Sequence, residues 1–206
     1  MQVASGTMDL EEQIAALLGA GDLRAAATLC VEAYGPEVLG FLVTLLRSED
    51  DASEAFAQAC EDLWRGLARF ERRCPLRTWF YTLARHSASR LRRSPQRRPG
   101  RRVTLEEASE VAERVRSRTL PHLRTDVKDR FATIRDALEE DDRALLVLRV
   151  DRGLSWNDIA RVYSEDGASD PTLARVAARL RKRFQSVKDE IRSRARQAGL
   201  WPDEEP

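Results

Sequence analysis

Apolar residues recur at intervals of three and four along much of the chain, a spacing that gathers them on one face of an α-helix. In the first half this pattern predicts helices over residues 8–18, 22–33, 38–46, 52–64 and 76–93. Gly19 is expected to close the first helix and Asp22 to cap the second. We expect Tyr34-Gly35-Pro36 to form a turn and residues 48–51 an acidic break, because glycine, proline and clustered acids interrupt helices.

The second half of the chain repeats this helical periodicity. Its apolar stripes are Phe131, Ile134 and Leu138; Ala144, Leu145 and Leu148; and Leu173, Val176, Leu180, Phe184 and Val187. Gly153 is expected to end one helix, and Ser155 to cap the next with Asp158 as its partner. A loop over residues 164–170 leads to a basic last helix. Such a pair predicts a helix-turn-helix, whose second helix enters the major groove, although many helical hairpins share the pattern.

A stretch rich in proline, glycine and charge separates the two halves, and such a composition cannot bury a core. Within it, Thr104 and Glu107 resemble a capping box, so residues 105–118 are expected to form a lone helix that Pro121 ends. The chain is therefore predicted to be all-α. Two helical domains, residues 1–93 and 128–206, are expected on either side of a linker, residues 94–127.

Charge is distributed unevenly along the 206 residues, although the net charge is only +1. Residues 1–64 carry twelve acids and two arginines, whereas residues 65–93 carry nine arginines and one acid, Glu71. This asymmetry favours an acidic face for one partner and a basic face for another.

The basic stretch also carries aromatic residues: Phe70, Trp79, Phe80 and Tyr81. Dense arginine suits a phosphate backbone, and aromatic faces suit unstacked bases. The alternative is a solvated charged helix whose aromatic side chains fill the core.

Neither a membrane-spanning apolar run nor a secretory signal is expected, which favours a cytoplasmic protein. Cys30, Cys60 and Cys74 are widely spaced with no CxxC, and His86 and His122 lie far apart and near no cysteine pair. This spacing argues against structural zinc and favours reduced thiols. We expect no cofactor and no catalytic residues, because the chain contains neither a glycine-rich phosphate loop nor a histidine-bearing triad.

The order of residues in the basic stretch resembles region two of bacterial sigma factors, specifically the extracytoplasmic-function type. The similar segments are Trp64-Arg65, Phe70-Glu71, Leu76-Arg77-Thr78-Trp79-Phe80-Tyr81 and Leu83-Ala84-Arg85-His86. In that family the loop and helix open the minus-ten element of a promoter and hold a flipped base. The resemblance implies that ten residues contact this element, with Trp79 alternatively a core residue: Arg72, Arg73, Cys74, Arg77, Thr78, Trp79, Tyr81, Arg85, His86 and Arg92.

The preceding helix, residues 52–64, is similar to the family's contact with the clamp helices of RNA polymerase. The resemblance implies a polymerase-binding set of Asp51, Glu54, Gln58, Glu61 and Asp62, whereas the same acids could form a solvated face. Three positions depart from the family: Ala57-Gln58 replaces the common Gln-Glu, and Cys60 replaces Phe. Core RNA polymerase is thus one expected partner and promoter DNA the other; an anti-sigma factor is a further candidate.

The helix pair near the C-terminus resembles sigma region four, through Gly153-Leu154-Ser155 and Asp158-Ile159-Ala160. Its turn, residues 163–170, is about three residues longer than the family's compact turn, as counted along the sequence, so region four is atypical. The resemblance implies a minus-thirty-five contact through Asp170, Thr172, Arg175, Arg179, Arg181, Lys182 and Arg183. Thr172, Arg175 and Arg179 share one helix face and are expected to reach base edges, or alternatively phosphates.

The sequence is therefore interpreted as a sigma factor that lends promoter specificity to RNA polymerase. The first alternative is a degenerate sigma-like regulator that binds polymerase or DNA without initiating transcription. The second is a generic binder of double-stranded DNA.

Overall fold

The computed structural model describes residues 3–93, 106–125, 130–164 and 167–200. Within these ranges every regular element is helical and no strand occurs, which confirms the all-α prediction. The chain forms two compact units, Met1–Leu120 and Pro121–Pro206.

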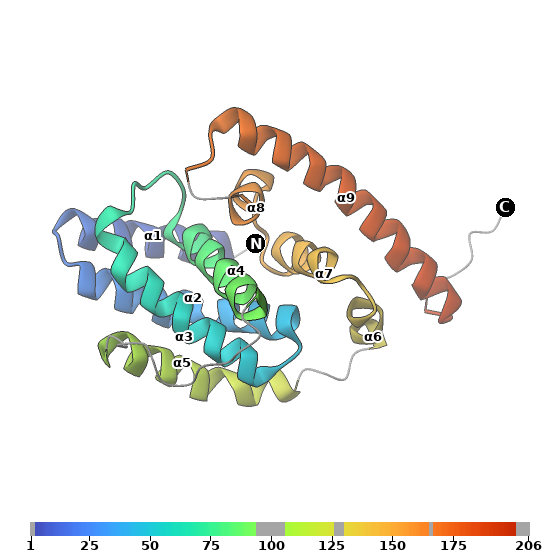
Figure 1. Cartoon of the computed structure of the whole chain (residues 1–206), viewed down its shortest axis with the longest axis horizontal. Helices are drawn as coiled ribbons and strands as arrows, with labels where there is room; N and C mark the ends of the chain where they lie inside the picture. The colour runs from blue at the N-terminus through green and yellow to red at the C-terminus, as the bar shows by residue number, and fades with distance from the viewer. Residues whose placement is uncertain (1–2, 94–105, 126–129, 165–166, 201–206) are drawn as a thin grey trace. The chain divides into compact units, whose positions relative to one another are not determined.

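Four helices form the body of the first unit: α1 (Val3–Gly19), α2 (Leu23–Leu46), α3 (Glu49–Gly66) and α4 (Leu76–Arg93). Helix α3 packs on both α2 and α4, and α1 packs on α2 (Figure 1). The aromatic side chains of Phe41, Phe56, Phe80 and Tyr81 fill the centre. As predicted, Asp22 caps α2, because its carboxylate accepts a hydrogen bond from the Ala25 amide at 3.0 Å.

Helix α2 runs without interruption through Tyr34-Gly35-Pro36, so the expected turn is wrong. Proline removes one helical hydrogen bond, which would have involved the carbonyl of Glu32. Glu32 and Pro36 are both exposed, so water can satisfy that carbonyl. Gly35 is buried, and a Cβ added there would lie 2.9 Å from Val115 Cγ1. The glycine therefore serves close packing and not a turn.

Helix α3 begins at Glu49, so the expected acidic break is its first turn. The Ser48 hydroxyl caps this turn by accepting a hydrogen bond from the Asp51 amide at 3.2 Å. Clustered acids suit the first turn, because the helix dipole places partial positive charge there. The predicted apolar face of this helix is buried, as expected.

Part of the expected linker is a helix of the first unit. Helix α5 (Glu106–Thr125) buries Ala108, Val111 and Val115, and its Arg114 pairs with Glu32 of α2 at 2.9 Å. The helix continues past Pro121, where an end was expected. The composition of the expected linker predicted no buried core, but the apolar residues of α5 recur at helical spacing and are buried on one face. Thr104 lies outside the described residues.

The second unit contains α6 (Arg130–Asp136), α7 (Glu140–Leu146), the π-helical turn η2 (Val147–Asp151), α8 (Trp156–Val162) and α9 (Asp170–Gln197). Gly153 follows η2 at a φ of +65°, close to the helix end that the sequence predicted there. Ser155 caps α8 as predicted: its hydroxyl accepts from the Asp158 amide at 3.1 Å. The buried Leu173, Leu180 and Val187 anchor α9. The side chain of Phe131 lies outside the described residues.

Helix α2 is long and apolar enough to cross a membrane, by length and composition alone. This differs from the expectation drawn from the sequence. Within the first unit, 56% of its most apolar window is buried, as in the core helix of a folded domain.

Candidate nucleic-acid interface

A short loop, Glu71–Pro75, joins the 3-10 turn η1 (Leu67–Arg69) to α4 and carries Arg72 and Arg73. Its first end is fixed by Phe70, whose ring stacks on Trp79 with centroids 4.9 Å apart. Gly66 lies against the same indole, since an added Cβ there would lie 2.8 Å from Trp79 Cη2. The aromatic pair therefore anchors the beginning of the loop.

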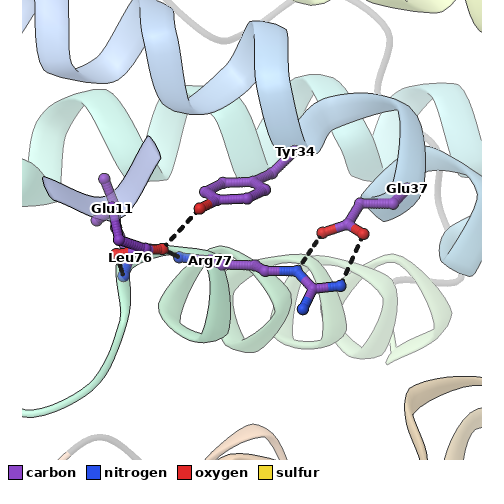
Figure 2. A network of polar contacts seen from close by, with 5 residues as sticks. All are labelled: Glu11, Tyr34, Glu37, Leu76 and Arg77. Carbon is purple, nitrogen blue, oxygen red and sulfur yellow. Dashed lines mark hydrogen bonds and ion pairs between the residues drawn. The ribbon is translucent and has the colours of Figure 1, made fainter. Parts of the chain in front are cut away.

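The other end of the loop is fixed by a carboxylate from α1. Glu11 accepts hydrogen bonds from the backbone amides of Leu76 and Arg77, each at 3.1 Å, and from the Tyr34 hydroxyl at 2.9 Å (Figure 2). Burial and the nearby Glu11 raise the pKa of Tyr34, so its hydroxyl remains a donor. The first turn of α4 is thereby tied to both α1 and α2.

Between these anchors the arginines reach solvent. Arg72 and Arg73 are exposed, and Arg72 adopts a left-handed backbone with φ of +55°. Arg73 pairs with the exposed Glu71 at 2.7 Å, an interaction that water screens. The loop thus presents two cations on a backbone held at both ends, which suits contact with a phosphodiester chain.

Two residues expected to touch DNA are buried in the core instead, and a third is half-buried. Tyr81 is fully buried and packs edge-on against Phe41, with ring centroids 5.5 Å apart. Thr78 is 3% exposed. Trp79 is half-buried against Phe70 and Gly66. The structure therefore contradicts a DNA contact for Tyr81 and Thr78, because both project from the face of α4 that packs inward.

Arg77 belongs to an intramolecular ion pair. Its guanidinium binds both carboxylate oxygens of Glu37 in α2, at 2.5 and 2.8 Å (Figure 2), and both side chains are 21% exposed. Burial lowers the pKa of Arg77, but the hydrogen bond and charge of Glu37 outweigh this, so the pKa is raised. A bidentate pair of this kind is geometrically specific. Arg77 therefore has an intramolecular partner, and its contact with DNA stays a prediction.

We expect Arg77→Ala to lower the free energy of unfolding by about 2 kcal/mol, because it leaves the half-buried Glu37 carboxylate without this charged donor. Thermal and urea unfolding would measure the loss. In a double-mutant cycle, Arg77→Ala should cost little more once Glu37→Ala is present. Additive losses would contradict a direct pair.

The remaining minus-ten candidates lie in the loop and along α4. Cys74, Arg85 and His86 are half-buried, whereas Arg92 is exposed and donates to the Leu45 carbonyl at 3.1 Å. These positions stay predictions for DNA contact. The side chains of Cys74, Arg85 and His86 reach the surface less fully than those of Arg72 and Arg73.

The acidic residues of α3 differ in exposure. Glu54 is exposed, and Asp51 is half-buried. Glu61 is 4% exposed and pairs with Arg65 at 2.5 Å, so its expected place on the open face is wrong. Its side chain is buried within the first unit and also accepts a hydrogen bond from the Gln58 amide at 3.4 Å.

Gln58 and Asp62 form part of the same internal network. The Gln58 amide donates to Asp62 at 2.8 Å, and Asp62 also pairs with Arg90 of α4. Both residues therefore help to hold α3 against α4. Of the five polymerase-binding candidates, Glu54 is the most accessible.

In the second unit, one face of α9 is open and basic. Arg175, Arg179, Arg181 and Lys182 are exposed, as are Asp170 and, in part, Thr172. Arg183 differs, because it pairs with Asp142 and, at 3.7 Å, with Asp141 of α7. Arg183 thus ties α9 to α7, and because its side chain stays 41% exposed, its expected phosphate contact remains a prediction.

Two of the three cysteines are buried, as expected for reduced structural thiols. Cys30 and Cys60 are fully buried, and burial raises the pKa of each thiol, which disfavours the reactive thiolate. In the described part of the chain, no cluster of three His, Cys, Asp or Glu side chains could hold a metal ion.

Sequence reasoning missed Glu11, Glu37 and the pair Asp141–Asp142. A signal existed for the first: Cys74 and Pro75 precede α4 but carry no side-chain oxygen that could cap it. The cap therefore had to come from elsewhere in the chain. Which acid supplies it cannot be read from spacing, since Glu11 lies 65 residues from Leu76.

Comparisons with known proteins agree with this geometry. Residues 30–98 match the family model described as Sigma-70 region 2, and this range includes α3, the loop and α4. The chain is 28% identical over 162 residues to the RNA polymerase sigma-H factor of Pseudomonas aeruginosa, a similarity that covers 76% of this chain and 83% of the relative. No solved structure matches the chain.

A match of that extent cannot be confined to the first unit, which ends at Leu120, and so reaches the unit that contains α8 and α9. The two findings together bear out the resemblance seen in the sequence: the chain carries a Sigma-70 region 2 and is similar over 76% of its length to a bacterial RNA polymerase sigma factor.

Proposed function

We propose that this sigma factor is of the extracytoplasmic-function type and opens the minus-ten element of its promoters through the loop Glu71–Pro75 and the adjoining surface of α4. The observation that carries the proposal is the pair of exposed arginines on a loop anchored at both ends. A fixed backbone presents cations to the DNA without the entropic cost of ordering a mobile loop on binding.

In this proposal the second unit reads the minus-thirty-five element. The exposed Arg175 and Arg179 lie four residues apart, and therefore on one face of α9 near its N-terminal end. Arg181 and Lys182 lie further along and are assigned to phosphate contacts. Seven residues separate the end of α8, Val162, from the start of α9, Asp170, which supports an atypical region four.

Core RNA polymerase is the proposed protein partner, and the cytoplasm the proposed place of action. Sigma factors in general act by binding and not by catalysis. An anti-sigma factor stays a prediction.

Helix α3 is the proposed contact with polymerase, and Glu54→Lys tests it. Reversing this exposed charge should weaken binding to core polymerase about tenfold, mainly through slower association at low salt. Glu110→Lys, at an exposed position of α5, makes the same charge change elsewhere in the first unit. Equal affinity of Glu54→Lys and Glu110→Lys in fluorescence binding assays would count against α3 as the contact.

A further inference from the structure

The first turn of α4 is capped by a side chain from another helix. The first amides of a helix have no partner within it, and the preceding residue usually supplies one. Here Cys74 and Pro75 carry no side-chain oxygen, and Glu11 of α1 accepts from the amides of Leu76 and Arg77 instead (Figure 2). Its negative charge also complements the positive end of the α4 dipole.

The capping carboxylate is itself held in place. Tyr34 of α2 donates a hydrogen bond to Glu11 Oε1 at 2.9 Å (Figure 2). Three residues further along α2, the Glu37 carboxylate accepts a hydrogen bond from the Arg77 guanidinium (Figure 2). The backbone and the side chain at the start of α4 are therefore tied separately, one through α1 and one through α2. Together these contacts determine the direction in which the chain enters α4.

The chain that enters α4 at this point is the arginine loop. Arg73 lies only three residues before Leu76, so the orientation of the first turn governs where the exposed cations point. We infer that Glu11 is a positioning residue for promoter opening, which it serves by holding the arginine loop through the first turn of α4. This inference rests on the proposed function, and it assigns a role to a residue outside the range 30–98 that matches the family model.

The role differs from general stabilisation. The buried Leu76, Phe80 and Ala84 hold α4 against the core, whereas Glu11 is half-buried at its margin. Losing the cap should therefore loosen the first turn and the loop while the unit stays folded, since local opening does not require global unfolding.

The test uses the full chain bound to core polymerase, with Glu11→Ala beside Glu12→Ala, an exposed neighbour on the same helix. On a duplex promoter, Glu11→Ala should form open complexes at about one fifth of the wild-type level or lower, as measured by permanganate reactivity. A defect of this size corresponds to the free energy of a lost helix cap. On the same promoter with its minus-ten region already unpaired, Glu11→Ala should initiate within about twofold of wild type, because that template does not require opening. Glu12→Ala should match wild type on both templates.

Hydrogen exchange gives a readout that does not depend on any promoter. The amides of Leu76 and Arg77 should exchange faster in Glu11→Ala, with the amides of buried Phe80 and Ala84 unchanged. Glu11→Gln keeps one side-chain carbonyl and should lie between wild type and Glu11→Ala. It also serves as the test variant should Glu11→Ala unfold.

Two results would overturn the inference. One is normal opening of duplex promoters by both Glu11 variants. The other is an equal loss on duplex and unpaired templates, which would show a defect in polymerase binding or folding. Failure of the wild-type protein to open any promoter is a separate result, because it would remove the proposed function together with this inference.

Discussion

Replacing Arg72 and Arg73 together with alanine is expected to abolish promoter opening. Both side chains are exposed, and the loop that bears them is anchored by Phe70 and Glu11, so no compensating movement is expected. A charge-assisted hydrogen bond contributes about 1.5–3 kcal/mol, so two lost contacts correspond to a loss of about a hundredfold or more. Permanganate reactivity of minus-ten thymines would report the bubble directly.

Glu71→Ala is the matched control for this loop. It removes the acid that pairs with Arg73 but retains both arginines, so opening should equal or exceed that of wild type. Circular dichroism should be unchanged in both variants, because all three side chains are exposed. A bubble of normal intensity in the double arginine variant would contradict the assignment of the loop to the minus-ten element.

The second large effect is expected for Arg175→Ala. Arg175 is exposed in the second turn of α9, and an arginine that reads a guanine edge contributes about 1–3 kcal/mol of discrimination. The variant should therefore lose preference at one or two positions when holoenzyme selects from a promoter pool randomised over the minus-thirty-five element. Binding to all other sequences in the pool should change little.

Lys182→Ala provides the comparison, since Lys182 lies two turns further along α9 and is also exposed. Loss of a phosphate contact should weaken binding to all sequences alike and make the salt dependence shallower. If Arg175→Ala gives this same uniform loss with the base preference intact, then Arg175 holds phosphate and does not read sequence.

Periodicity predicted the helices well, because apolar spacing reports directly which face is buried. The stripe through Phe56, Cys60 and Leu63 is buried as expected, and so is that through Leu173 and Leu180. Glycine and proline were less reliable predictors of where a helix ends. Gly35-Pro36 lies within α2, since tertiary packing against Val115 favours glycine there and the exposed position of Pro36 leaves the unpaired carbonyl within reach of solvent.

The candidate site was harder to predict than the fold. The sequence of α4, a helix of eighteen residues, does not reveal that Arg77 meets Glu37 or that Tyr81 meets Phe41. Arginine suits an internal bidentate pair as well as it suits a phosphate. Contacts between residues 40 positions apart separate the two roles, and they follow from the folded arrangement only.

The most direct measurement is run-off transcription with purified core RNA polymerase on promoters enriched from a randomised library. The chain is expected to support transcripts that start at a defined distance from the selected elements, and the Arg72→Ala/Arg73→Ala variant is expected to support none. Binding to polymerase without any transcript above that of core enzyme alone would contradict the account, and would favour a sigma-like regulator that does not initiate transcription.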